Sequence, residues 1–284
     1  MNPRLLITGG AGFLGTHLLQ QAKTFTAAGT LHQTPTTPLP DVTFHVCDLE
    51  QPEDVKILLD RVQPEIIIHA ACSDQGANLL AIVPAAGLLA IQSAERHIRF
   101  IHLSTDQVFD GTTAPYIETS ATCPINPYGK AKSQAEDLVR SLNPQAMIVR
   151  TSLLYDLRTP DRQTNHLIQA TATGDPFCLF VDEWRSSIWV ENLADALLEI
   201  ATKDISGILH IGGPQALNRW DLGMQLLQHY DVTPTSNIQK GTIKKSGLVR
   251  PPNLTLDSTY AQQLLQTPLL SLPEARKKVY NHKF

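Results

Sequence analysis

The sequence predicts an α/β fold, a doubly wound parallel sheet with a smaller C-terminal lobe. Short apolar runs alternate with amphipathic stretches from Leu5 to Arg150, as in successive βαβ units. After Arg150 the alternation gives way to polar, proline-containing segments, which are typical of an added lobe. A chain of 284 residues is long enough for both parts.

Each element is predicted from its local pattern. Leu5-Leu6-Ile7 begins an apolar strand, a glycine-rich turn opens the first helix, and Ile66-Ile67-Ile68 indicates a buried strand. We expect strands over 5–8, 30–33, 43–47, 65–70, 100–103 and 146–150. We expect helices over 12–22, 52–61, 79–96 and 133–141.

The second part of the chain is expected to fold as a lobe over the carboxyl edge of the sheet. We place the sheet domain at residues 1–152 and the substrate-binding lobe at 153–284. Within the lobe, an amphipathic helix over 191–202 is followed by an apolar strand over 208–211. This strand–helix excursion, near 187–212, is expected to rejoin the main sheet.

Composition excludes several function classes. With 27 acidic and 23 basic residues the net charge is -4, which argues against a nucleic-acid or anionic-membrane binder. The cysteines, Cys47, Cys72, Cys123 and Cys178, form no C-x-x-C pair, so we expect no metal site. We find no signal-peptide pattern and no apolar run long enough for a membrane span, and we expect a cytoplasmic protein.

The first strand runs into a phosphate-binding pattern, Thr8-Gly9-Gly10-Ala11-Gly12-Phe13-Leu14-Gly15. Gly9, Gly12 and Gly15 satisfy G-x-x-G-x-x-G, and Gly10 in place of Gly9 satisfies G-x-G-x-x-G. Glycines allow backbone to approach a pyrophosphate, and the free N–H groups of the following helix attract it. The position after a strand and before a helix favours dinucleotide binding over an ordinary turn.

The second strand decides between the two nicotinamide dinucleotides. NAD enzymes place an acid at its end to grip the ribose, and this sequence has neither an acid nor an arginine there. Thr30 or a neighbour occupies that place, and His32, Gln33 and Thr34 offer hydrogen bonds to a 2′-phosphate. The sequence therefore favours NADP(H), with NAD(H) as the alternative.

Two further patterns carry chemistry. Tyr128 and Lys132 form Y-x-x-x-K, which places both side chains on one helix face, where the ammonium should lower the pKa of the phenol. Ser104 and Thr105 end the strand over 100–103, at the sheet edge where ligands bind. Taken alone, the Y-x-x-x-K pattern also fits a helix start, and Ser104-Thr105 also fits a capped turn. Together with the glycine loop, and in this order along the chain, the patterns favour an active site.

These motifs resemble the extended short-chain dehydrogenase/reductases, most specifically the dTDP-4-dehydrorhamnose reductase branch. The resemblance rests on 8–15, 48–49, 69–71, 104–111, 115–119, 124–132, 150–152 and 250–257. It implies a Rossmann fold and the catalytic triad Thr105, Tyr128 and Lys132. The expected cofactor contacts are Gly9, Gly12, Phe13, Leu14, Gly15, Thr30, His32, Asp48, Leu49, Ala70, Ala71, Ser104, Tyr128 and Lys132.

The substrate contacts are expected mainly from the lobe. The candidates are Asp106, Gln107, Asn165, Trp184, Arg185 and Arg250, because arginines match diphosphate oxygens well. Two positions depart from the family pattern. Val83 stands where the family has an asparagine, and Gln107 replaces the glutamate of the sugar-nucleotide dehydratases. A neutral amide cannot abstract a carbon-bound proton, which argues against 4,6-dehydration.

We therefore expect an NAD(P)H-dependent reductase of a keto group on a nucleotide-activated sugar. The alternatives are a sugar-nucleotide epimerase and a non-catalytic NADP-binding subunit similar to the regulatory subunit of methionine adenosyltransferase. The apolar segment over 79–91 suits a helix buried on several sides. In this superfamily such a helix often packs against its mate, so we also expect a homodimer, with burial inside the monomer as the alternative.

Overall fold

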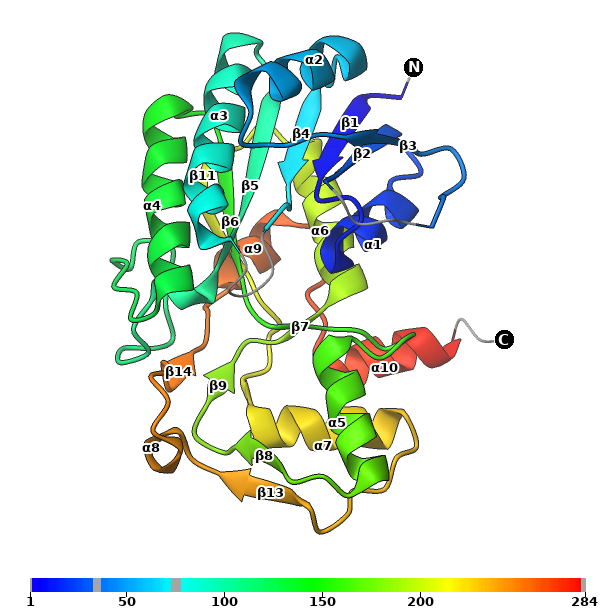
Figure 1. Ribbon diagram of the computed structural model, residues 1–284, viewed down its shortest axis with the longest axis vertical. Helices are drawn as coiled ribbons and strands as arrows, with labels where there is room; N and C mark the ends of the chain where they lie inside the picture. The colour runs from blue at the N-terminus through cyan, green and yellow to red at the C-terminus, as the bar shows by residue number, and fades with distance from the viewer. Residues whose placement is uncertain (1, 33–36, 73–77, 282–284) are drawn as a thin grey trace.

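The computed structural model describes residues 2–32, 37–72 and 78–281 (Figure 1). Its upper part is built on a seven-stranded sheet in the order β11-β6-β5-β4-β1-β2-β3, and every pairing in it is parallel. This is the doubly wound order, whose switch point lies between β1 and β4. The strands are β1 Arg4–Thr8, β2 Thr26–Leu31, β3 Thr43–Val46, β4 Ile66–His69, β5 Arg99–Thr105, β6 Met147–Thr151 and β11 Gly207–Ile211.

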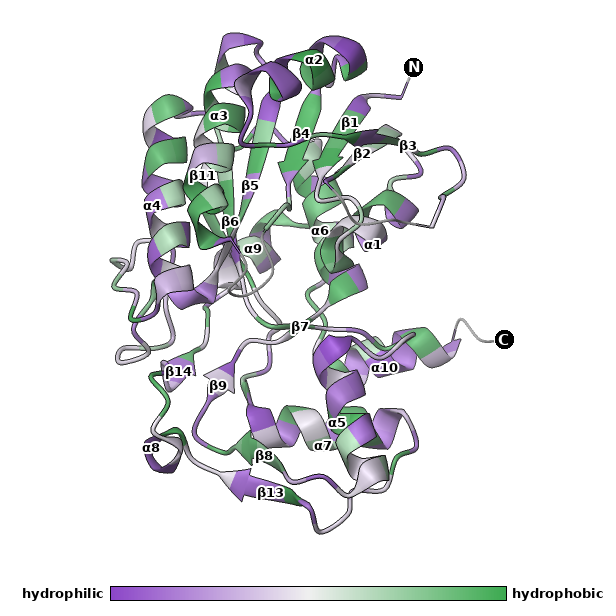
Figure 2. Cartoon of the chain, viewed as in Figure 1, coloured by the Kyte–Doolittle hydropathy of each residue, from purple (hydrophilic) through white to green (hydrophobic). Residues whose placement is uncertain are grey.

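Helices cover both faces of this sheet. One face packs on α1 Phe13–Gln21 and α6 Val190–Ala201, and the other on α2 Pro52–Val62, α3 Ile82–Glu95 and α4 Pro127–Leu142. Side chains of a strand alternate between the two layers, so Leu5 and Ile7 enter one core and Leu6 the other. Figure 2 shows the result as hydrophobic strands between helices whose outer sides are hydrophilic.

The second strand differs from the expected 30–33. β2 starts at Thr26 and ends at Leu31, and Gln33 lies outside the described residues. The small residues Ala27, Ala28 and Gly29 lack the β-branched and aromatic side chains that predict a strand. Small side chains occur here because neighbouring residues approach the strand closely. A Cβ built on Gly29 would lie 2.9 Å from Cδ1 of Leu19. The position after the strand, where NAD enzymes carry the acid, therefore falls to His32 and not to Thr30.

The apolar segment after β4 forms a 3-10 turn, η1 Leu79–Ala81, followed by α3. Its apolar surface is mostly buried inside the monomer, against the sheet and α4. At Gly87 the two helices approach so closely that a Cβ would lie 2.5 Å from Cδ2 of Leu138. Packing within the monomer thus accounts for the apolar pattern, and the homodimer stays a prediction.

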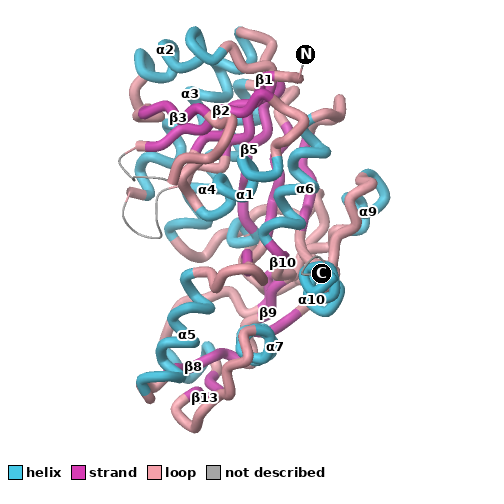
Figure 3. The backbone as a smooth tube through the Cα atoms, turned by 90° about the vertical axis from the view of Figure 1, so that its right-hand side faces the viewer, coloured by secondary structure: helices cyan, strands magenta, loops and turns pink. Residues whose placement is uncertain are grey.

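The lower lobe is assembled from separate stretches of the chain around α5 Arg162–Thr173 and α7 Arg219–His229 (Figure 3). Between them β11 returns to the main sheet beside β6. The other elements of this part of the chain are β7 Leu154–Tyr155, β8 Phe177–Phe180, β9 Trp184–Arg185, β10 Ile188–Trp189, β12 Leu217–Asn218, β13 Ile238–Gly241, α8 Ile243–Ser246, β14 Asn253–Leu254 and α10 Leu272–Asn281. Helix α9 Thr259–Leu264 instead packs beside β11 on the main sheet. Among the described residues, no helix combines the length and apolar character needed to cross a membrane.

Candidate active site

The loop between β1 and α1 has the geometry of a phosphate cradle. Gly9 adopts a positive φ of 71°, and a Cβ on Gly15 would lie 2.1 Å from the Gly9 carbonyl oxygen. Within the described chain, no side chain caps the N-terminus of α1, whose first residues are Phe13 and Leu14. The backbone N–H groups at the start of the helix, those of Phe13 and Leu14, are therefore available to a pyrophosphate.

Thr30 stabilises this loop from below. Its hydroxyl accepts a hydrogen bond from the Gly9 N–H at 3.1 Å, and its carbonyl oxygen accepts one from the Gly10 N–H at 2.8 Å. The threonine is buried, so its role is to hold the glycine loop. His32 follows at the end of β2, while Gln33 and Thr34 lie outside the described residues.

The other predicted cofactor residues lie along the same edge of the sheet. A Cβ on Gly9 would lie 2.7 Å from the Ala71 Cα, so the glycine loop touches the segment of Ala70 and Ala71. Asp48 and Leu49 follow β3, where the Asp48 carboxylate accepts the Glu50 N–H at 3.0 Å and Leu49 packs on the core. Ser104 departs from this pattern, because its hydroxyl donates to the buried Glu136 carboxylate.

The predicted catalytic residues converge at the end of β5. Asn126 caps α4 by accepting the Gly129 N–H at 2.7 Å, which fixes the turn that carries Tyr128. The Thr105 hydroxyl lies beside the Tyr128 phenol and lowers its pKa, an effect smaller than that of burial. Gln107 joins the two elements, because its side-chain oxygen accepts from the Asn126 amide at 3.0 Å and its N–H donates to Thr105 Oγ1 at 3.2 Å.

The expected lowering of the Tyr128 pKa is wrong for this geometry. Burial raises the pKa of Tyr128, and so does the Cys72 thiol, whose Sγ lies 3.8 Å from the phenol oxygen. The Lys132 ammonium instead donates to the Leu103 carbonyl oxygen at 2.5 Å, and burial lowers its pKa. The phenol is therefore held as a proton donor, the form that a reduction requires.

Asp106 connects the end of β5 to the lobe. Its carboxylate accepts hydrogen bonds from Ser152 Oγ at 2.6 Å and from Thr105 Oγ1 at 3.3 Å. Nε of Arg185, on β9, lies 3.9 Å from the same carboxylate. Burial raises the pKa of Asp106, an effect that the nearby Arg185 charge opposes. The predicted residues Asp106 and Arg185 are thus brought together.

A cluster of three arginines, Arg185, Arg219 and Arg250, surrounds the buried carboxylate of Glu183. Arg185 Nη2 lies 3.1 Å from this carboxylate and Arg250 Nη1 lies 3.2 Å from it. Burial lowers the pKa of Arg219, and the positive charges of Arg185 and Arg250 lower it further. Among the described residues, Arg185 Nη1 is buried without a hydrogen-bond partner. Guanidinium groups match the oxygens of a diphosphate well, so this cluster is a candidate site for an anionic ligand.

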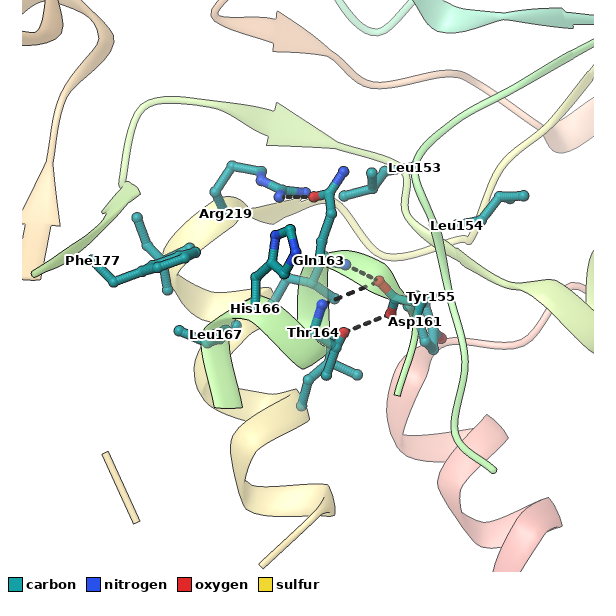
Figure 4. A pocket seen from close by; sticks show the side chains of 14 residues that line it. Leu153, Leu154, Tyr155, Asp161, Gln163, Thr164, His166, Leu167, Phe177 and Arg219 are labelled. Carbon is teal, nitrogen blue, oxygen red and sulfur yellow. Dashed lines mark hydrogen bonds between the residues drawn. The ribbon is translucent and has the colours of Figure 1, made fainter. Parts of the chain in front are cut away.

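Beside this cluster the lobe contains a cavity of about 120 Å³ (Figure 4). Its walls are largely apolar, with Leu153, Phe177 and Leu179 among them. Polar groups gather at one edge, where Figure 4 shows Arg219 hydrogen-bonded to the side-chain oxygen of Gln163. Apolar walls with a few fixed polar groups are typical of a pocket for a small organic ligand.

Sequence reasoning missed three polar residues of this site. Gln163, His166 and Arg219 line the cavity, whereas the predicted Asn165 is exposed on α5 and is not among the lining residues. Trp184 lies next to Arg185 on β9 with 36% of its surface exposed. The spacing of Gln163 and His166 places both on one helix face, but only the packing of α5 on α7 shows that this face lines the cavity.

Comparison with known proteins agrees with this geometry. The family model described as the RmlD substrate binding domain matches residues 3–283. The chain is 32% identical to a dTDP-4-keto-6-deoxy-D-glucose reductase of Streptomyces niveus over 222 residues, 74% of this chain and 73% of the relative. It is 26% identical to methionine adenosyltransferase 2 subunit beta of Xenopus tropicalis over 283 residues, 92% and 82% of the two chains.

Among solved structures, the fold matches a dTDP-4-dehydrorhamnose reductase of Bacillus anthracis in complex with NADP. The TM-score is 0.82 at 20% identity, covering 99% of this chain and 100% of that one. The doubly wound architecture expected from the sequence is thereby confirmed. The match of the family model over nearly the whole chain shows that this protein belongs to the RmlD substrate-binding domain family.

Proposed function

We propose that the protein is an NADP(H)-dependent oxidoreductase that reduces a keto group on a nucleotide-activated sugar. One observation carries this proposal. A series of side-chain contacts leads from Thr105 through Asp106 and Arg185 to Glu183, whose carbonyl oxygen accepts the N–H of Arg219, a residue that lines the cavity. The keto group of the substrate would lie at the Thr105 hydroxyl, its diphosphate at the arginines and its nucleotide base in the cavity.

The cofactor fits the residues present. The crowded glycines Gly9 and Gly15 and the uncapped start of α1 are suited to a pyrophosphate. The absence of an acid at His32 supports NADP(H), with NAD(H) as the alternative. When bound, the reduced nicotinamide supplies a hydride to the carbonyl carbon.

The chain's own residues supply the proton and stabilise the developing charge. Tyr128 Oη, kept protonated by burial, donates its proton to the carbonyl oxygen. The Thr105 hydroxyl, already in contact with the phenol, donates a hydrogen bond to that oxygen as it gains charge. The Lys132 ammonium, held by the Leu103 carbonyl oxygen, lies on the same helix face and would hold the nicotinamide ribose.

The substrate would lie across the junction of the sheet domain and the lobe. Arg185, Arg219 and Arg250 would hold the diphosphate, and Gln163 and His166 would meet the polar edge of the base. Gln107 and Trp184 are the remaining candidates beside the sugar. We also propose that the sheet domain spans residues 1–152 and the lobe residues 153–284. We further propose that the protein forms a homodimer and is cytoplasmic.

A second candidate is the non-catalytic subunit, since one relative carries that name. The neighbouring side chains of Tyr128 and Thr105 and the buried Arg185 favour catalysis, because neither feature is needed to bind a partner protein. An epimerase is the third candidate. It would retain its cofactor through turnover, so mass spectrometry of nucleotide released from the purified protein distinguishes it from a reductase that exchanges NADP(H).

The direct test is a panel of 4-keto sugar nucleotides with NADPH oxidation as the readout. We expect oxidation with at least one of them and formation of the reduced sugar nucleotide. NADP(H) binding without turnover of any substrate, together with binding of a partner protein, would establish the regulatory role instead.

A further inference from the structure

Two rows of polar side chains cross the sheet beneath α4, where an apolar layer would be expected. Thr8, His69 and His102 are in register across β1, β4 and β5. Two residues further along β5, Ser104 is in register with Arg150 and His210 of β6 and β11. All of these side chains are buried. A buried polar layer is retained at a cost, which points to a role in the site above it.

The centre of this layer is Glu136, which projects from α4 one turn after Lys132. Its side chain is only 2% exposed. Arg150 binds the carboxylate as a fork, with Nε 3.1 Å from both oxygens and Nη2 2.7 Å from Oε2. The Ser104 hydroxyl donates to the same carboxylate. Glu136 therefore fastens the helix that carries Tyr128 and Lys132 to the strands β5 and β6.

The other side of Arg150 is also fixed. Its guanidinium lies 5.0 Å from the ring centre of Phe109, and Nη1 is 3.4 Å from Nε2 of His210. A planar fork held on several sides has little freedom to follow a moving helix. Arg150 therefore fixes the position of Glu136 and, through it, the position of α4 relative to the end of β5.

Charge adds to this geometry. Burial lowers the pKa of Lys132, and Cys72 and the Glu136 carboxylate oppose that effect. The neighbouring His69 and His102 are neutral, since burial and the Lys132 charge lower their pKa values, that of His69 to about 3. Glu136 is thus the carboxylate within the helix that helps to keep Lys132 charged.

We propose that Glu136, held by Arg150, is a positioning residue that seats the Tyr128–Lys132 face of α4 against Thr105. This inference rests on the proposed reductase function. It adds to that function a residue that touches neither cofactor nor substrate. Because proton transfer depends on the phenol reaching the carbonyl oxygen, a small displacement of α4 would reduce turnover steeply.

Two variants distinguish the effect of the Glu136 charge from the effect of its contact with Arg150. Glu136→Gln keeps the size and an acceptor oxygen but removes the charge, so turnover should fall by roughly 10- to 100-fold. With the charge gone, Lys132 loses its proton at a lower pH. The alkaline limb of the kcat/KM profile should therefore move about one pH unit toward acid. Arg150→Lys keeps the Glu136 charge but loses the two-nitrogen contact with its carboxylate. Turnover should therefore fall, while the alkaline limb of the kcat/KM profile should stay at the wild-type pH.

Asp137→Asn is the matched control, because it removes the same charge from the next, exposed residue of α4. It should behave as wild type. NADP(H) affinity measured against pH by calorimetry gives a second readout that needs no substrate, and in Glu136→Gln its alkaline loss should begin at lower pH. Thermal unfolding identifies variants that fail to fold.

The outcomes are distinct. If folded Glu136→Gln matches wild type in turnover and in both pH profiles, the inference is overturned. If Glu136→Gln does not fold, Arg150→Lys decides, and wild-type turnover in that variant overturns the inference as well. A wild-type protein without turnover of any keto-sugar nucleotide would instead contradict the proposed function, while the affinity profile would still test Glu136.

Discussion

The guanidinium Nε of Arg185 lies 3.9 Å from the carboxylate Oδ2 of Asp106, at the point where the lobe meets the end of β5. Asp106 in turn contacts Thr105, and Arg185 contacts Glu183 among the arginines. The Thr105 hydroxyl, proposed to be catalytic, and the proposed diphosphate site are therefore joined through two side chains. Under the proposed function, a substrate whose diphosphate binds the arginines would have its sugar beside Tyr128.

The first prediction concerns substrate binding. Arg185→Met removes a guanidinium whose Nη1 is buried without a partner among the described residues. Hydrogen bonds to charged groups contribute about 1.5–3 kcal/mol, so KM for the sugar nucleotide should rise roughly 10- to 100-fold. NADP(H) affinity should not change. The exposed Arg140→Gln on α4 is the control, and an Arg185→Met variant with wild-type KM would remove the diphosphate assignment.

The second prediction concerns the cofactor. β2 ends at Leu31, so His32 occupies the place of the acid that grips the ribose in NAD enzymes. We expect wild type to bind NADP(H) at least as tightly as NAD(H). His32→Asp should repel the 2′-phosphate and shift the ratio of affinities toward NAD(H) by about tenfold or more. Calorimetry with both cofactors measures this, and a strong wild-type preference for NAD(H) would refute it.

The third prediction concerns acid stability. Burial alone would raise the pKa of Glu199, but the backbone N–H groups of Gln266 and Thr267, each 2.8 Å from the carboxylate, lower it to about 2. A pKa depressed by folding stabilises the protein above the unfolded value of 4.5, and this contribution is lost as pH falls through about 2.

Glu199→Gln should therefore cost about 1–2 kcal/mol of unfolding free energy at pH 7, after allowance for solvent screening. The difference from wild type should shrink as the pH falls from 4.5 to 2. Urea unfolding at several pH values measures it. Glu95→Gln, an exposed carboxylate at the end of α3, should show no such trend, and an equal loss for Glu199→Gln at every pH would contradict the argument.

Local patterns in the sequence were sufficient for the main architecture. The buried run Ile66-Ile67-Ile68 and the glycine loop identified β4 and the start of α1, and the resemblance to the reductase branch is confirmed by the family match. The motifs also named Tyr128 and Thr105, which lie beside each other in the structure, and their catalytic roles stay a prediction. These features depend on residues close in sequence, where period and spacing carry the information.

What the sequence left out depends on distant residues. Arg219 and Gln163 are 56 positions apart, yet they form one edge of the cavity. The pKa of Tyr128 was predicted in the wrong direction because helix spacing shows that Lys132 shares its face but not that burial dominates or that the ammonium binds the Leu103 carbonyl. Burial of this kind follows from packing, which no single segment encodes.

The central claim is that Tyr128 protonates a carbonyl oxygen during reduction, and Tyr128→Phe tests it most directly. The variant keeps the ring but lacks the phenol that lies beside Thr105. With a keto-sugar nucleotide that wild type reduces, single-turnover NADPH oxidation should slow about 10²–10⁴-fold while NADP(H) affinity is retained. Oxidation by Tyr128→Phe at the wild-type rate would contradict the account.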